Sequence, residues 1–226
     1  MRLWHDERVR TPDFDRLYAD DPDPWKVASS WYERRKIAIV LASLRRPRYR
    51  SAWDAGCGTG ELVAALAERV DGILATDASR AAVALATTRL ADTPHVEVAH
   101  SPLPQRPDGL AQAPDLVVVS EVLYYLYADN RAATYALVDE IAAPAADLVL
   151  VNWGPHPDDA HVSGLEAFNE ASAALAERGW GRVVTHADVE FLLGVFSRDV
   201  PDDVGGRDTA NGDDADHLPT SPEETR

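Results

Sequence analysis

Short apolar runs alternate along the chain with helical segments, and this alternation limits the possible folds more than any other feature. The runs predict strands at 51–54, 72–76, 95–98, 115–120 and 147–151. Periodic apolar residues and cap signals predict helices at 30–44, 61–69, 79–90, 129–142 and 164–178. Apolar strands separated by helices are typical of a parallel sheet covered on both faces. Two further strands, 182–188 and 190–197, have no helix between them and predict an antiparallel hairpin at one edge of the sheet.

The fold class predicted from this pattern is α/β, with one Rossmann-like domain at 29–198. Its sheet would have seven strands, mostly parallel, with a C-terminal antiparallel hairpin. Residues 1–28 are polar and predict a lead-in loop or short helix, while the acidic stretch 199–226 predicts a disordered tail. Ser30 and Glu33 have the spacing of a capping box, and the helix that they begin is expected to bury Ile37, Leu41 and Leu44.

Charge and cysteine content narrow the classes of partner. The net charge is −16, which repels phosphate backbones and argues against a nucleic-acid partner. The single cysteine excludes an intrachain disulfide, and neither an apolar N-terminal segment nor a membrane-length apolar run is present. We therefore expect a cytoplasmic protein that acts on a small molecule without a membrane span. The sequence is compatible with a monomer or a homodimer.

The loop 54–60, Asp-Ala-Gly-Cys-Gly-Thr-Gly, joins a predicted strand to a predicted helix. Gly56, Gly58 and Gly60 permit positive φ angles and close approach of the backbone to a ligand. This context, rather than the glycines alone, indicates a nucleotide site. Cys57 has no adjoining histidine or cation and is interpreted as a small packing residue within that loop.

Two carboxylates narrow the nucleotide. Asp77 ends the second strand, where a carboxylate can accept hydrogen bonds from both hydroxyls of a ribose, as in NAD or S-adenosylmethionine. Asp54 stands just before the glycines of the loop. There it would repel a pyrophosphate but could hold the ammonium of a methionine moiety, directly or through water. The three glycines are spaced G-x-G-x-G, so the loop lacks the glycine three residues after the second that pyrophosphate binders use. These features favour S-adenosylmethionine as the cofactor and therefore methyl transfer as the reaction. Two alternatives stay open: Asp54 could instead satisfy backbone donors at the end of the strand, and binding of NADH would indicate a dehydrogenase.

Three blocks of sequence resemble the nodulation protein S family of methyltransferases. They are 21–36, which includes Asp-Pro-Asp-Pro-Trp and Ser-Trp-Tyr-Glu-Arg-Arg-Lys, then 47–50, Pro-Arg-Tyr-Arg, and 120–126, Ser-Glu-Val-Leu-Tyr-Tyr-Leu. The resemblance covers residues 14–198 and implies a class I S-adenosylmethionine-dependent methyltransferase. The family's namesake N-methylates the deacetylated amino group at the end of a chito-oligosaccharide, and its relatives act on other small acceptors.

The cofactor residues expected from the loop and the resemblance together are Asp54, Gly56, Cys57, Gly58, Gly60, Asp77, Ala78, Leu103 and Ser120, with Trp31 and Tyr32 as a lid. Relatives often carry an aspartate after the third strand, whereas 99–104 here contains no acid. Adenine recognition is therefore expected to rest on backbone groups near Leu103 or on a side chain that the sequence does not identify. Relatives also often have His-Trp after the fifth strand, where this chain has Asn152-Trp153.

An amine acceptor must lose a proton before it attacks a methyl group, so a proton acceptor is expected near the carboxyl end of the sheet. Glu121 could accept that proton or orient an ammonium, and Tyr124 and Tyr125 could flank the methyl group or pack in the core. His156, just after the fifth strand, is the predicted base, and His100 and His161 are alternatives.

Other functions remain open from the residues alone. An O-methyltransferase is the near alternative to an N-methyltransferase, and the missing acid near Pro102 allows a cofactor-binding protein without catalysis. The stretch 156–159, His-Pro-Asp-Asp, resembles the zinc motif of amino-sugar deacetylases, but those enzymes carry it after their first strand rather than the fifth. No metal site is therefore expected.

Overall fold

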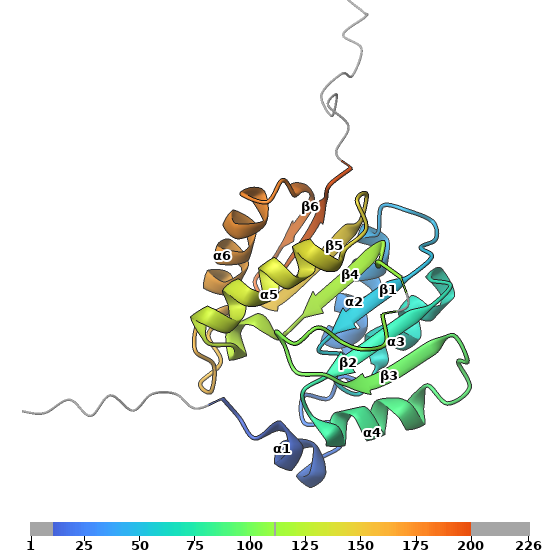
Figure 1. Ribbon diagram of the computed structural model, residues 1–226. Coiled ribbons are helices and arrows are strands. Elements are labelled where there is room, and N and C mark those ends of the chain that lie inside the picture. The colour runs from blue at the N-terminus through green and yellow to red at the C-terminus, as the bar shows by residue number, and fades with distance from the viewer. Residues whose placement is uncertain (1–10, 111, 200–226) are drawn as a thin grey trace, which may run out of the picture.

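The computed structural model describes residues 11–110 and 112–199 (Figure 1). A single sheet of seven strands forms its centre, in the order β3-β2-β1-β4-β5-β7-β6. The strands are β1 (Ala52–Ala55), β2 (Ile73–Asp77), β3 (Val96–His100), β4 (Leu116–Ser120), β5 (Asp147–Trp153), β6 (Gly181–Ala187) and β7 (Phe191–Ser197). Every predicted strand is present within two residues of its predicted bounds, and the predicted α/β fold is confirmed.

The first five strands are parallel and the last two are not. β1 pairs with β2 and β4, β2 with β3, and β4 with β5, all in parallel register. β7 runs antiparallel between β5 and β6, so the predicted hairpin forms the edge of the sheet beside β5. The central strands are buried on both faces, as their continuous apolar runs predict.

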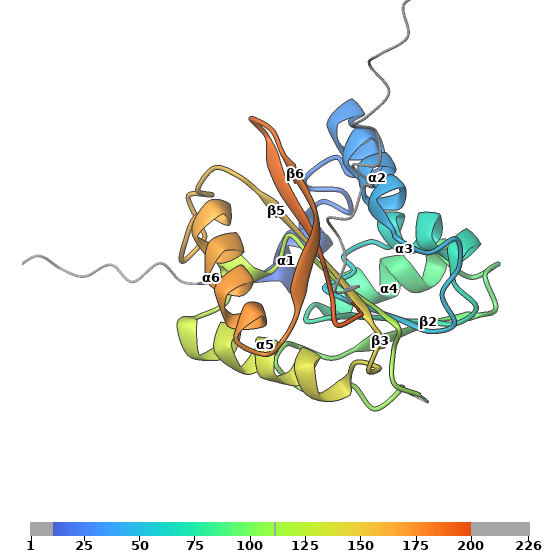
Figure 2. The same ribbon diagram turned by 90° about the horizontal axis from the view of Figure 1, so that it is seen from above.

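Helices cover both faces of the sheet (Figures 1 and 2). One face carries α2 (Trp31–Ser43), α3 (Glu61–Leu66) and α4 (Arg80–Arg89), and the other carries α5 (Ala128–Ile141) and α6 (Gly164–Ala176). The predicted helix 61–69 ends as a separate 3₁₀ turn, η1 (Ala67–Arg69), and a second turn, η2 (Leu123–Tyr125), follows β4. No helix in the described ranges is long and apolar enough to cross a membrane.

The inner face of α2 differs from the prediction. Val40 and Leu44 are buried as part of the core, but Ile37 and Leu41 are only half-buried. The other buried residues of α2 are the charged Glu33 and Lys36. The helix is rotated relative to its apolar pattern because two charged side chains find partners inside the protein.

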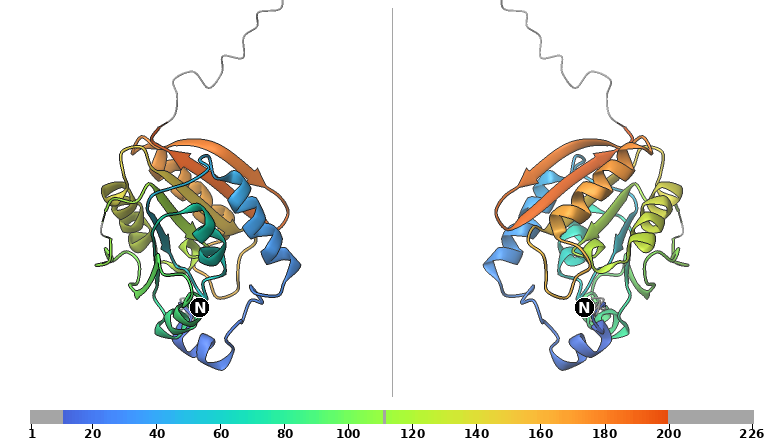
Figure 3. Two further views of the ribbon diagram at one scale, coloured as in Figure 1. Left: turned by 90° about the vertical axis from the view of Figure 1, so that its right-hand side faces the viewer. Right: turned by 90° about the vertical axis from the view of Figure 1, so that its left-hand side faces the viewer.

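A short helix, α1 (Phe14–Asp20), precedes α2 and lies beyond the carboxyl ends of the parallel strands (Figure 3). Thr11 Oγ1 donates to the carbonyl oxygen of Tyr125 at 3.3 Å. Asp15 Oδ1 accepts hydrogen bonds from Ser79 Oγ at 2.8 Å and from Ala81 N at 3.1 Å, at the start of α4. The lead-in segment therefore covers the edge of the sheet at which α/β proteins bind ligands.

Candidate functional site

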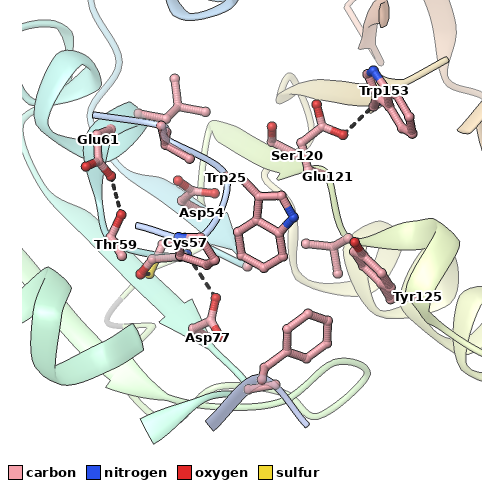
Figure 4. A pocket seen from close by; sticks show the side chains of 18 of the residues that line it. Trp25, Asp54, Cys57, Thr59, Glu61, Asp77, Ser120, Glu121, Tyr125 and Trp153 are labelled. Carbon is pink, nitrogen blue, oxygen red and sulfur yellow. Dashed lines mark hydrogen bonds between the residues drawn. The ribbon is translucent and has the colours of Figure 1, made fainter. Parts of the chain in front are cut away.

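A cavity of about 490 Å³ opens at this carboxyl edge (Figure 4). The residues that end β1, β2, β4 and β5 form its floor, and residues from the lead-in segment and α2 form its walls. In Figure 4, Trp25 stands between Asp54 and Asp77 on one side and Glu121 on the other. We call the first side the loop end of the cavity and the second the Glu121 end.

The glycine loop has the backbone that the sequence predicts. Gly56, Gly58 and Gly60 have φ angles of 100°, 54° and 86°, in the region that favours glycine. A Cβ atom on Gly56 would overlap Val122 Cγ2, so this position also has no room for a side chain. Gly56 and Gly58 line the cavity, whereas Gly60 caps the N-terminus of α3 outside the lining.

Asp54 ends β1 beneath the loop and is the most unusual carboxylate in the cavity. It is 1% exposed, and neither of its oxygens has a hydrogen-bond partner among the described residues. Burial, together with the charge of Asp77, raises its pKa to about 7. A buried carboxyl group without partners is costly unless a ligand supplies them, so Asp54 fits the ammonium-binding role predicted for it.

Asp77 ends β2 at the same end of the cavity. Its Oδ2 accepts from Gly58 N at 2.9 Å and its Oδ1 from Ser79 N at 2.8 Å. Burial is the main cause that raises its pKa, and these backbone bonds oppose the shift. A carboxylate oxygen can accept more than one hydrogen bond, so both oxygens can still receive ribose hydroxyls.

Four further predicted cofactor residues lie in the wall of the cavity. Ala78, Leu103 and Ser120 line the cavity, as does Cys57. Burial raises the pKa of the Cys57 thiol well above its ordinary value. The thiol is therefore neutral, which favours the packing role. Taken together, a positive-φ glycine loop, an unpartnered carboxyl group at the end of β1 and a second carboxylate at the end of β2 fit S-adenosylmethionine.

Aromatic residues of the lead-in segment also line the loop end of the cavity, and they were not among the predicted site residues. Tyr18 and Trp25 pack edge to face with ring centroids 5.6 Å apart, and Phe14 meets Tyr125 at 5.1 Å. The Tyr18 hydroxyl approaches the glycine loop, 3.1 Å from where a Cβ on Gly58 would be. Only Trp25 lay within a block that the family resemblance singled out.

Glu121 lies at the opposite end of the cavity, where several hydrogen-bond donors hold its carboxylate. It follows β4 with a φ of 60°, which is rare for a residue with a side chain. Its Oε1 accepts from Lys36 Nζ at 2.7 Å, and its Oε2 accepts from Tyr124 Oη and from the backbone N–H of Trp153, both at 2.7 Å. Three donors from three segments therefore fix this carboxylate in place.

Lys36 joins Glu121 to a second carboxylate. Lys36 Nζ lies 3.0 Å from the carboxylate of Glu33 on the same helix, and both side chains are more than nine-tenths buried. We call these three residues the Glu33–Lys36–Glu121 cluster. With both glutamates ionised it carries two negative charges and one positive charge. Tyr32 lies beside it, with Lys36 Nζ 5.0 Å from its ring centroid, and also lines the cavity.

Besides Gly60, four predicted residues lie outside the cavity lining. Trp31 is 71% exposed and outside the lining, although its neighbour Tyr32 is within it. The Nε2 atoms of three histidines have other contacts: His156 with the carbonyl oxygen of Ala160, His100 with that of Ala78, and His161 with Thr11 Oγ1. None of the three lines the cavity. Over 11–110 and 112–199 no three His, Cys, Asp or Glu residues are grouped as a metal site.

Comparison with known proteins relates the chain to one family. Residues 13–176 match the model of the nodulation protein S family. No curated protein matches the chain. Among solved structures, a candidate methyltransferase from Pseudomonas syringae is 39% identical, with a TM-score of 0.63, over 75% of this chain and 100% of that one.

Two structures from Bradyrhizobium japonicum WM9 are also similar. The N-methyltransferase NodS in complex with S-adenosyl-L-homocysteine is 24% identical, with a TM-score of 0.68, over 80% of this chain and 94% of that one. A second structure of the same enzyme is 25% identical, with a TM-score of 0.64, over 74% of this chain and 96% of that one.

Proposed function

The chain belongs to the nodulation protein S family of S-adenosylmethionine-dependent methyltransferases, and we propose that it methylates an amino group of a small-molecule acceptor. Two parts of the cavity support this proposal, one for the cofactor and one for the acceptor. The amino-sugar acceptor that the sequence resemblance implies is one candidate within this class.

At the loop end, this chain's residues would bind and orient the cofactor. Asp54 would hold the methionine ammonium, Asp77 the ribose hydroxyls, and the backbone at Gly56 and Gly58 would approach the ligand closely. When bound, S-adenosylmethionine supplies a methyl group activated by the sulfonium. Tyr18 and Trp25 would exclude water from this end of the cavity, and a fixed geometry for donor and acceptor is the main contribution that a methyltransferase site can make.

The observation that carries the choice of an amine is the charge of the Glu33–Lys36–Glu121 cluster. Glu121 lies at the end of the cavity away from Asp54 (Figure 4). It shares the ammonium of Lys36 with Glu33. A second cation would balance the cluster, because an uncompensated charge in a buried site is unfavourable. An alkylammonium acceptor supplies that cation, whereas a neutral alcohol does not. Tyr124 and Trp153 would shape the site through their bonds to Glu121.

A matched acceptor screen tests this function. We would incubate the protein with S-adenosylmethionine and pairs of compounds that differ only in an amino or hydroxyl group, such as glucosamine and glucose, and record a 14 Da gain by mass spectrometry. We expect gain on amines and none on their hydroxyl partners. Methylation of the hydroxyl members alone would favour the O-methyltransferase, and calorimetric binding of the cofactor without any turnover would favour a binding protein.

A further inference from the structure

Glu33 has the sequence position of a helix cap but does not act as one. Ser30 Oγ accepts the backbone N–H of Glu33 at 3.5 Å, which is half of a capping box. The other half is missing, because the backbone N–H of Ser30 donates to the carbonyl oxygen of Lys26 at 2.8 Å. At α6, by contrast, Ser163 and Glu166 form both halves. The Glu33 carboxylate is therefore free of a capping role and turns into the cavity.

The Glu33 carboxylate receives fewer hydrogen bonds than the Glu121 carboxylate. Glu121 already accepts hydrogen bonds from three donors, so most of its acceptor positions are occupied. Within the described ranges, Glu33 receives a side-chain hydrogen bond from Lys36 alone. The charged groups that face it are Lys36, Glu121 and Asp23, two of them negative. Burial is the main cause that raises the pKa of Glu33.

The other proton acceptors predicted from the sequence are absent from this end of the cavity. His156, His100 and His161 lie outside the lining, as do the other histidines of the described ranges. Asp23 lines the cavity, but its carboxylate caps the backbone N–H groups of Val27 at 2.6 Å and Ala28 at 3.2 Å. Of the three carboxylates Glu33, Glu121 and Asp23, Glu33 therefore has the fewest hydrogen-bond donors.

We propose that Glu33 is the catalytic residue that takes the proton from the acceptor ammonium, while Glu121 holds that ammonium and Lys36 connects the two carboxylates. This rests on the proposed amine acceptor. One N–H bond of the ammonium breaks, an O–H bond forms on Glu33, and the nitrogen lone pair becomes free to form the N–CH₃ bond. The S–CH₃ bond of the sulfonium would break in the same transfer, and its electron pair would stay on sulfur. The methylated amine is again a cation, and Glu33 then releases its proton to solvent, so that each turnover yields one proton.

The first test compares Glu33→Gln with Glu33→Asp and with an exposed control, Glu68→Gln. With the amine that gains 14 Da in the screen, glucosamine being the first probe, Glu33→Gln should lose about 100-fold or more of kcat. Its kcat/KM should also lose the acid limb that the wild type shows above pH 4.5, the ordinary glutamate pKa. Glu33→Asp should restore part of the rate, and Glu68→Gln should match the wild type. Unchanged kcat and pH profile in Glu33→Gln would overturn the proposal.

The second test needs no turnover and so separates this proposal from the proposed function. Carboxyl carbons of glutamate are labelled with ¹³C, and the protein is titrated by NMR with and without glucosammonium chloride. We expect one resonance to be absent from Glu33→Gln and to titrate with a pKa above 4.5 in the wild type. The pKa of that resonance should fall when the ammonium is added, because a nearby cation favours the ionised carboxylate. A Glu33 resonance that titrates as an ordinary glutamate would contradict the proposal, whatever the screen finds. A raised Glu33 titration with no amine methylated would reject the amine acceptor, and with it the base role.

Discussion

At the scale of single residues, the buried carboxyl group of Asp54 makes the stability of the ligand-free protein depend on pH. Its pKa is raised to about 7 in the folded chain, against about 3.9 for an unperturbed aspartate. The folded state therefore holds the proton more tightly than the unfolded state. The free energy of unfolding is highest below pH 4, falls as the pH rises from about 4 to 7, and stays low above that, with a total change of roughly 4 kcal/mol at most.

Asp54→Asn should consequently stabilise the ligand-free protein at pH 8. The amide carries no charge, although it still lacks partners in a buried position, so we expect a net gain of about 1–3 kcal/mol. This corresponds to a Tm increase of roughly 2–10 °C by scanning calorimetry. The same variant should bind S-adenosylmethionine at least about 10-fold more weakly. Asp92→Asn, at an exposed position, provides the control. A variant that is less stable than the wild type at pH 8 would mean that Asp54 has partners after all.

At the scale of elements, strand ends were predictable and the inner face of α2 was not. Asp54 and Asp77 were found because a buried strand followed by glycine or a helix cap is a local signal. The burial of Glu33 and Lys36 was missed because periodicity assigns charged helix residues to solvent. Their burial depends on Glu121, 85 residues beyond Lys36 in the chain. His156 was placed after the right strand, but its ring turns to the carbonyl oxygen of Ala160 within its own loop.

One carboxylate, Asp15, connects the lead-in segment to a helix that covers the sheet. Asp15 ties α1 to the start of α4 through Ser79 and Ala81, and backbone hydrogen bonds there lower its pKa. Asp15→Ala should release α1, and with it the aromatic cover of the loop end, so that calorimetry shows cofactor binding weakened several-fold with little change in Tm. Asp20→Ala is the matched control, because Asp20 ends the same helix and pairs with Arg16 in solvent. Equal affinities for the two variants would show that α1 does not contribute to the site.

At the scale of the whole molecule, the sheet follows from pattern alone, but the site depends on chain segments that meet only in the fold. The mostly parallel sheet and the edge hairpin were predicted from apolar runs and from the lack of a helix between the last two strands, whereas the order of the strands comes from the structure. The cavity combines the lead-in segment, α2 and the ends of four strands, so a ligand bound there links parts of the chain that are distant in sequence. The predicted acidic tail lies outside the described residues, apart from its first residue, and stays a prediction.

A ligand that joins these segments should stabilise the whole molecule, and the gain should depend on pH through Asp54. S-adenosylmethionine at 100 times its Kd at pH 8 should add about 2.7 kcal/mol, or roughly 5–10 °C in Tm. At pH 6 most Asp54 is protonated and must lose its proton before it holds an ammonium. The affinity should then be about 10-fold lower and the stabilisation about 1.4 kcal/mol smaller at the same cofactor concentration. Thermal shift assays at both pH values measure this difference, and Asp54→Asn should abolish it. Equal shifts at pH 6 and pH 8 in the wild type would show that the cofactor's ammonium is held elsewhere.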